Sequence, residues 1–410
     1  MSPSKSTPAL PLFSFLYFVI LLPFLQLGTG YYSSIAALGS VLVFIRFHRW
    51  LLLNRNGLLR IAAAALMLLS YVLSPLEESQ ALLRICREVV FFYLITGLIR
   101  DSVAVRPFQS YSVLLLAMVF TAILTLFIMS QAGVIPVGRL SFPNEWYYLD
   151  DRALPTDLSF LYAEVVRPNG FYTEPSYAAL VLFSVVLFVQ PTFKLFFVSK
   201  ITLVMAVISI ILTQSASGII FVALLIAYDI NRSRMLSPVD QLIFLVAVVL
   251  GLFVLSKLNI NVLHRVASID DESGENSGFT RLVAPLSAIW AVISISPFGL
   301  PVDYLVNSAI PNGSGEIWEE VLHNGFFNFF IEFGLTGIAI AACFLSACRD
   351  VRMGLFVVAI LMQNGGPLSI DKFVLFVMTA ALYNSQIVAR NAIVRSTASS
   401  RSQARNVGPA

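Results

Sequence analysis

The sequence predicts an all-α polytopic membrane protein, and three observations support this fold class. Hydrophobic residues make up 58% of the 410 residues and charged residues 12%, the latter about half the share found in soluble domains. Apolar runs of membrane-spanning length recur along the whole chain. Lysine and arginine gather in alternate connections between these runs, as is typical of cytoplasmic loops. We therefore expect residues 1–390 to form a single integral membrane domain.

The apolar runs predict about twelve transmembrane helices. They are centred on residues 10–27, 31–45, 58–74, 82–99, 111–130, 175–190, 195–213, 217–230, 239–256, 324–346, 353–364 and 371–389. The second, eighth and eleventh runs are short, so the number of spans depends on them. The first run has no small-residue cleavage site, and we expect a span there rather than a cleaved signal peptide.

Basic residues indicate the orientation of these helices. They follow the second, fourth, eighth and tenth runs, flank the start of the seventh, and occur throughout the tail. The turns on the opposite side contain no Lys or Arg: residues 28–30, 74–80, 213–217 and 363–370. Because short cytoplasmic loops retain basic residues, both termini are expected in the cytoplasm. Residues 391–410, rich in Ser, Arg, Gln and Ala, are expected to form a disordered cytoplasmic tail.

Two long connections then fall outside the cytoplasm, at residues 134–173 and 256–323. Both are rich in Pro, Gly, Asn, Asp and aromatic residues. Long ordered loops usually carry function, so the functional site is expected on this face.

The sequence lacks motifs for nucleotide or metal chemistry. It contains no P-loop, no HExxH motif and no Ser/His/Asp arrangement. Cys86, Cys343 and Cys348 lie in or beside apolar segments without ligand spacing, and we expect buried or near-membrane thiols there. The net charge of +3 gives no indication of a nucleic-acid partner. No metal, cofactor or nucleic acid is expected, and an activated, lipid-borne substrate would fit this pattern.

The first candidate site lies where the first of these two loops enters the sixth run. Pro175 suits the first turn of a helix, and Thr173 or Glu174 would cap it. The helix N-terminus then carries a partial positive charge, to which Arg167 adds a full one. Such an arrangement suits an anion such as phosphate. The alternative is that Arg167 and Glu174 merely pair with each other at headgroup level.

The second candidate site opens the tenth run. Asn324 is a good helix cap, and His323 suits a proton acceptor or a hydrogen-bond donor to an oxyanion. Glu332 would lie about 12 Å further along the helix, where an ionisable group needs a partner or a cavity. Gly334 and Gly337 would let another helix approach closely. The alternative is a purely structural histidine.

Further arginines add to these two sites. Arg84, Arg87 and Glu88 share one helix face, so either Arg84 pairs with Glu88 or the arginines face a lipid phosphate. Arg281 opens a semi-apolar stretch that ends at residues 297–299 (Pro-Phe-Gly). We expect this stretch to form an amphipathic helix on the outer surface.

These residues resemble elements of a bacterial family. Residues 167–176 (RPNGFYTEPS) are similar to the R-x-x-G-x-x-x-E-P-S element of O-antigen and exopolysaccharide polymerases. His323-Asn324 with Glu332, Gly334 and Gly337 resembles the H-N-x(7)-E-x-G-x-x-G element shared by those polymerases and O-antigen ligases. Residues 213–218 (TQSASG) resemble a Ser/Thr-rich turn of the family. Arg281 resembles the arginine before its P-x-G-x-G stretch, although residues 300–301 (Leu-Pro) replace the second glycine.

The resemblance implies a metal-independent glycosyltransferase at the periplasmic face of the bacterial inner membrane. Its donor would be an undecaprenyl-diphosphate-linked oligosaccharide, and its acceptor a sugar hydroxyl on an incoming lipid-linked repeat unit. Membrane lipid, a chain-length regulator and a flippase of the same pathway would be further partners. The candidate catalytic residues are Arg167 for phosphate, His323 as base or phosphate ligand, and Glu174 as base or positioning group. The candidate substrate-binding residues are Gly170, Arg84, Arg87, Arg281, Asn324 and Glu332.

Two other functions remain open. A ligase of the same superfamily would share the site but transfer the chain to a lipid acceptor such as a core oligosaccharide. A transporter or flippase of lipid-linked sugars would place its charged residues near the bilayer midplane, in repeated halves. Here the charges gather near one surface, and the sequence shows no internal repeat.

Overall fold

The computed structural model describes residues 57–73, 85–86, 88–93, 96, 109–132, 168–172, 174–189, 195–231, 284–300, 325–346, 348, 350–363, 372, 375–376, 379 and 383. Within these residues the regular structure is entirely helical, with no strand. The prediction of an all-α protein is therefore confirmed for this part of the chain. The expected spans at 10–27, 31–45 and 239–256 and the tail after residue 390 lie outside the described residues.

The helices follow the apolar runs of the sequence closely. They are α3 (Gly57–Leu73), α5 (Gln109–Gln131), α7 (Pro175–Ser184), which continues as the π-helix η3 (Val185–Val189), α8 (Phe196–Leu212), α9 (Ala216–Asn231), α12 (Ala284–Ile295), α14 (Gly325–Phe333), α15 (Thr336–Ser346) and α16 (Val351–Leu361). Both ends of α3, α5, α8 and α9 fall within two residues of the predicted runs. Among the described residues, no helix combines the length and the hydrophobicity that a membrane span requires.

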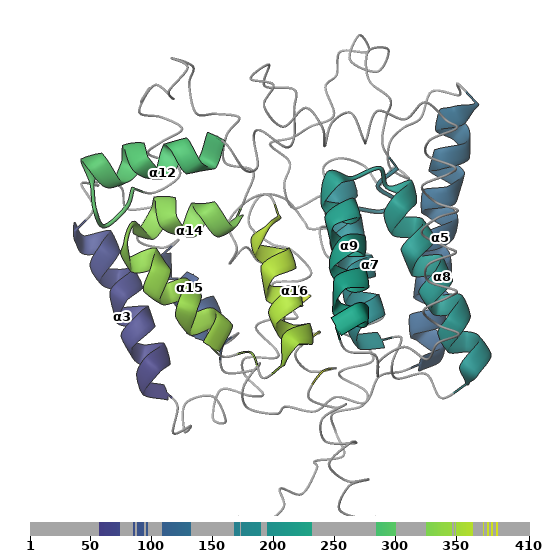
Figure 1. Ribbon diagram of the computed structural model, residues 1–410, viewed down its shortest axis with the longest axis horizontal. Helices are drawn as coiled ribbons and strands as arrows, with labels where there is room; N and C mark the ends of the chain where they lie inside the picture. Colours follow the sequence, from purple (N-terminus) through teal and green to yellow (C-terminus); the bar gives the residue numbers. More distant parts are fainter. Residues whose placement is uncertain are drawn as a thin grey trace, which may run out of the picture.

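One group of helices packs around α7 (Figure 1). This helix contacts α8 and α9, and α5 covers the far side of α8. Every side chain from Ser176 to Ser184 is buried, as expected for a helix that is apolar on all sides. The ring of Phe183 stacks on that of Phe221 of α9, with centroids 5.0 Å apart. The helix that follows the Glu-Pro-Ser segment is thus held in the centre of a bundle.

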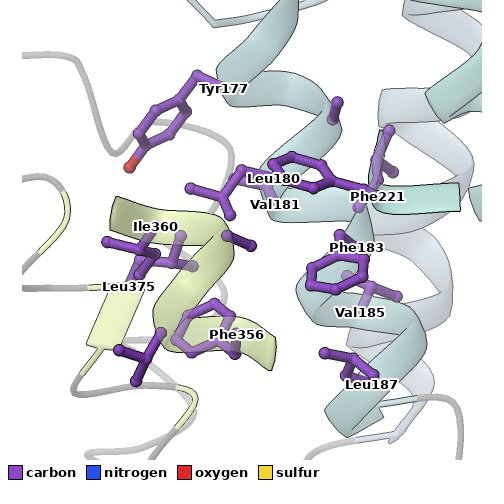
Figure 2. Close-up of a cluster of buried hydrophobic side chains, with 14 of the residues drawn as sticks. Tyr177, Leu180, Val181, Phe183, Val185, Leu187, Phe221, Phe356, Ile360 and Leu375 are labelled. Atoms are coloured by element: carbon purple, nitrogen blue, oxygen red, sulfur yellow. The ribbon is translucent and has the colours of Figure 1, made fainter. Parts of the chain in front are cut away.

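A second group consists of α3, α12, α14 and α15 (Figure 1). Helix α15 packs on α3, where the hydroxyls of Ser70 and Thr336 share a hydrogen bond. Helix α16 stands between the two groups and contacts both α7 and α14. Figure 2 shows Phe356 and Ile360 of α16 in one buried cluster with apolar side chains of α7 such as Leu180 and Val181. The rings of Phe356 and Phe188 are nearly perpendicular, with centroids 5.4 Å apart, so α16 links the two groups through one continuous core.

The outer faces of several helices carry large apolar side chains. The exposed fraction is 73% for Val72 of α3, 57% for Ile128 of α5, 75% for Trp290 of α12 and 56% for Ile338 of α15.

The tenth predicted span requires a correction. We expected one helix over residues 324–346, but the chain forms α14 and α15 with a break at Gly334 and Leu335. Gly334 has a positive φ of 53°, which ends a right-handed helix. The N–H of Leu335 donates to the carbonyl of Pro297 at 2.9 Å. A bond to a distant segment therefore replaces the bond that would continue the helix.

Helix α12 occupies the stretch expected to be an amphipathic surface helix. It ends at Ile295, directly before Ser296 and the Pro-Phe-Gly turn. Val292 is buried, whereas Trp290 and Ile295 are exposed, so the helix has an inner and an outer side. The helical part of that prediction is confirmed.

Candidate functional site

Helix α7 begins at Pro175, as the sequence predicts, but the expected side-chain cap by Glu174 is not formed. Glu174 is the N-cap residue with extended backbone (φ −135°, ψ 146°), and Pro175 occupies the first turn. The Glu174 carbonyl accepts hydrogen bonds from the N–H groups of Tyr177 and Ala178, both at 3.2 Å. Its carboxylate makes no capping bond to the helix, and Oε2 accepts instead from Ser176 Oγ at 2.9 Å. The motif serine thus helps to hold the motif glutamate.

The loop before Glu174 is folded tightly against α5. Gly170 has a positive φ of 61°, and a Cβ atom at this position would lie 3.3 Å from Ile123 Cγ1. The carbonyl of Asn169 accepts from the N–H of Tyr172 at 3.2 Å and closes the turn. Both the left-handed backbone and the close approach favour glycine here. Gly170 therefore shapes the loop that leads to Glu174.

Two tyrosines flank the Glu-Pro-Ser segment. The rings of Tyr172 and Tyr177 lie 5.8 Å apart at an angle of 44°. Tyr172 is fully buried, and burial raises the pKa of its hydroxyl above the ordinary value, because the phenolate loses its hydration. Tyr172 is therefore neutral at physiological pH and can act only as a neutral hydrogen-bonding group. We did not single out this pair from the sequence, since aromatic residues are common throughout the chain.

A polar turn lies close to the start of α7. It joins α8 to α9, and its buried polar residues are Thr213, Gln214, Ser215 and Ser217. A Cβ atom on Gly218 would lie 3.3 Å from Ala179 Cβ, and Phe221 meets Phe183 further along. Because these contacts advance in the same direction on both helices, α7 and α9 run parallel. Two helix N-termini, each with a partial positive charge, therefore lie side by side.

The second motif is locked to residues 297–300. The N–H of Leu300 donates to the carbonyl of Ile331 at 2.8 Å, and the N–H of Leu335 donates to that of Pro297. The half-buried Glu332 lies between these two bonds. The Pro-Phe-Gly turn, the weaker of the sequence signals, is thus a structural partner of the Glu-x-Gly segment.

The start of α14 packs against the end of α16. The N–H of Gly325 donates to the carbonyl of Gln363 at 2.9 Å, and Lys372 Nζ donates to the same oxygen at 3.5 Å. Neither Gln363 nor Lys372 was singled out from the sequence. A signal for Lys372 was available, because it lies inside the twelfth predicted span, where an ionisable residue is a functional candidate.

The described residues include three of the predicted site residues: Gly170, Glu174 and Glu332. The first two share the loop before α7, and the third lies at the junction with residues 297–300. Helix α16 contacts both α7, which follows the first two, and α14, which contains Glu332. The other candidates lie outside the described residues: Arg84, Arg87, Arg167, Arg281, His323 and Asn324.

A family model described as WcaD colanic acid polymerase matches residues 11–385. The match includes the segments around Glu174 and Glu332 as well as the polar turn and residues 297–300. Neither a curated protein nor a solved structure matches the chain. The resemblance to exopolysaccharide polymerases is confirmed, and the chain belongs to the WcaD colanic acid polymerase family.

Proposed function

We propose that this polysaccharide polymerase joins undecaprenyl-diphosphate-linked repeat units at the periplasmic face of the bacterial inner membrane. The observation that carries the proposal is the family match over residues 11–385, which makes the chain a polymerase of exopolysaccharide biosynthesis. The periplasmic location, the polyprenyl donor and the roles of single residues are the proposed refinements. They draw on the charge pattern of the loops and on the chemistry of the two motif segments.

Placement in a membrane is supported by the outer surface of the helices. Large apolar side chains such as Val72, Ile128 and Ile338 are more than half exposed. Contact with lipid chains would remove this surface from water, at about 25 cal/mol per Å² of apolar area. Composition points in the same direction, with a mean hydropathy of +0.84. We propose that these faces contact lipid and that both termini are cytoplasmic.

The proposed reaction is a glycosyl transfer. The oxygen of an acceptor sugar hydroxyl bonds to the anomeric carbon of the donor, and the bond from that carbon to the diphosphate oxygen breaks. The hydroxyl proton passes to His323 or to Glu174, and negative charge develops on the leaving diphosphate. In this scheme Arg167, Arg281 and the N-termini of α7 and α14 stabilise that charge.

The geometry at Glu174 supports a role in this chemistry. The carboxylate is held by Ser176 Oγ at 2.9 Å and makes no capping bond to its own helix. Positioning Arg167 or accepting a proton are the two roles that we propose for it.

The test is the length of the lipid-linked glycans in a deletion strain of the host. We expect single repeat units to accumulate on the outer leaflet, and the wild-type gene to restore long chains. Arg167→Ala and His323→Ala should fail to restore them, whereas the control Arg405→Ala in the predicted tail should succeed. Long chains stranded on the carrier would instead indicate a ligase, and single units trapped on the cytoplasmic leaflet a flippase.

A further inference from the structure

A groove of about 380 Å³ lies where α5 meets the loop that leads to Glu174. It is lined by five residues of the helix and one of the loop: Ala117, Met118, Thr121, Ala122, Thr125 and Phe171. Helix α5 is on the outer side of α8 (Figure 1), and Met118, Thr121 and Thr125 are exposed. The groove therefore opens on the outer face of α5, and its volume is typical of a ligand site, about 300–1,000 Å³.

The lining restricts the ligand to a hydrocarbon. None of the six residues is charged, and four of them are Ala, Met or Phe. The hydroxyl of Thr121 donates to the carbonyl of Ala117 at 2.8 Å, so its own helix already satisfies this donor. A diphosphate or a sugar would lose its hydration here without compensating hydrogen bonds, whereas an apolar chain makes favourable van der Waals contacts with such a surface.

Large side chains at both ends of the groove restrict the shape of the ligand. Leu114, Thr121 and Ile128 follow one another at intervals of seven residues, so they share one face of α5. Leu114 is 56% exposed and Ile128 57% exposed, and the small residues of the groove lie between them. A straight helix laid along α5 would rest on these two side chains and stay out of the groove. A flexible chain can enter it.

The position of the groove connects it to the Glu-Pro-Ser segment. Phe171 follows Gly170, at which a Cβ atom would lie 3.3 Å from Ile123 Cγ1. Ile123 is eight residues before the end of α5 at Gln131, which is about 12 Å along the helix axis. The loop therefore lies against the side of α5 and not only at its end. Glu174 comes three residues after Phe171 and is within about 11 Å of it.

We propose that this groove holds the prenyl chain of the lipid-linked substrate, with the diphosphate and the sugar at the Glu174 segment. The inference rests on the proposed function and adds to it a binding site for the lipid part of the substrate. A prenyl chain is uncharged, flexible and branched by methyl groups, and these are the properties that the lining and the two flanking side chains select. Phe171 joins the groove to the segment where the reaction is proposed.

Filling the groove tests the inference. Thr121→Phe and Thr125→Phe each place a ring in the groove, and because both positions are exposed the ring does not have to enter the core. The matched control is Ala65→Phe, which adds a ring to an exposed position of α3. The measurement is the initial rate of chain extension by the purified full-length protein in lipid nanodiscs. Repeat units are supplied on undecaprenyl diphosphate or on geranyl diphosphate, which has only two isoprene units.

The expected result is a change in KM that depends on the prenyl chain. In both groove variants the KM for the undecaprenyl substrate should rise by at least about fivefold, with kcat nearly unchanged and a much smaller rise for the geranyl substrate. Ala65→Phe should behave like the wild type. An unchanged preference for the undecaprenyl substrate in both groove variants would overturn the inference.

A photoreactive probe distinguishes the prenyl chain from other occupants. Polyprenyl diphosphate with a diazirine in its chain should label the peptides that contain Met118 and Phe171. Undecaprenyl diphosphate should compete with the probe, whereas phosphatidylglycerol should not. Equal competition by phosphatidylglycerol would indicate ordinary lipid contact and overturn the inference. A disulfide-linked dimer of Thr121→Cys, in a variant without the native cysteines, would place a second copy in the groove and overturn it as well.

The two experiments also separate this inference from the proposed function. If the wild-type protein extends no chain from either substrate, the proposed function fails, and the labelling still decides whether the groove holds a prenyl chain. If the wild-type protein extends chains but the probe does not label the groove, the inference fails and the proposed function remains intact.

Discussion

Gly299 and Gly334 lie so close together that neither position has room for a side chain. A Cβ atom on Gly299 would lie 2.6 Å from Gly334 N, and one on Gly334 would lie 2.5 Å from Gly299 N. Both residues also have positive φ, 91° and 53°. This backbone contact fixes the end of α14 against the turn after α12. It thereby determines where Glu332 lies.

Replacing Gly334 should disrupt this junction. Gly334→Ala puts a methyl group against the Pro297 carbonyl and imposes a left-handed backbone on an L-residue, so we expect a loss of at least about 2 kcal/mol. Gly354→Ala is the control, because a Cβ atom there meets nothing within 4 Å and helix propensity predicts a gain of about 0.5–1 kcal/mol. Thermal unfolding of the detergent-purified variants measures both. Equal midpoints for the two variants would contradict the role assigned to the junction.

Replacing Gln214 with glycine should stabilise the protein. Among the described residues, Gln214 alone has a positive φ without being a glycine, at 51°. This left-handed conformation costs a residue with a Cβ atom about 1–2 kcal/mol. Gln214→Gly relieves this strain, and we expect a gain of about 1 kcal/mol in unfolding free energy. Gln214→Ala keeps the strain and serves as the control. A lower midpoint for the glycine variant would show that the buried amide stabilises the turn.

The sequence predicts the helices better than the junctions between them. The ends of α3 and α8 follow from the limits of their apolar runs, because burial and helix length are properties of the local sequence. The break at Gly334 does not follow in this way. Gly334 alone is compatible with a helix that another helix approaches closely, and the break depends on residues 297–300, which are distant in the chain.

The candidate site shows the same contrast. Glu174 and Pro175 were predicted at the start of α7, since the start of a helix depends on a few neighbouring residues, although the Glu174 side chain makes no capping bond there. The cluster of Gln363 and Lys372 at the start of α14 was not predicted, because it brings together three separate segments. Single residues of this kind stand out in a sequence only when they are charged and lie within an apolar run, as Lys372 does.

Cys348 should react slowly with alkylating reagents. Burial, and secondarily the charge of Asp350, raises the pKa of the Cys348 thiol to about 12. A raised pKa means less thiolate at a given pH, so alkylation by iodoacetamide at pH 8 should be much slower in the folded protein than in the unfolded one. The rate should rise by about tenfold per pH unit until the pH approaches the pKa. A variant with Cys86→Ser and Cys343→Ser isolates this thiol, and an equal rate in folded and unfolded protein would contradict the prediction.

Asp350 should contribute to stability as the N-cap of α16. Its Oδ1 accepts from Met353 N–H at 3.1 Å, and Asp350→Ala should cost about 1 kcal/mol. Asp350→Asn retains the acceptor and should cost less, although it loses the ion pair with Arg352 at 3.3 Å, which is partly exposed and worth little. Chemical unfolding compares the two variants. Equal losses would mean that the charge, and not the cap, is what matters.

Variants of Glu174 and Ser176 test whether the Glu174 carboxylate accepts a proton in the reaction. If Glu174 accepts the acceptor proton, Glu174→Gln should lower the polymerisation rate by about 100-fold or more, because the amide has the shape of the carboxylate but no basicity. Ser176→Ala removes only the hydrogen bond to Oε2, and a loss of about tenfold or less is expected. The measurement is the initial rate of chain extension from lipid-linked repeat units with purified protein. A small effect of Glu174→Gln beside a large one of His323→Ala would assign the base to His323 and leave Glu174 as the group that positions Arg167.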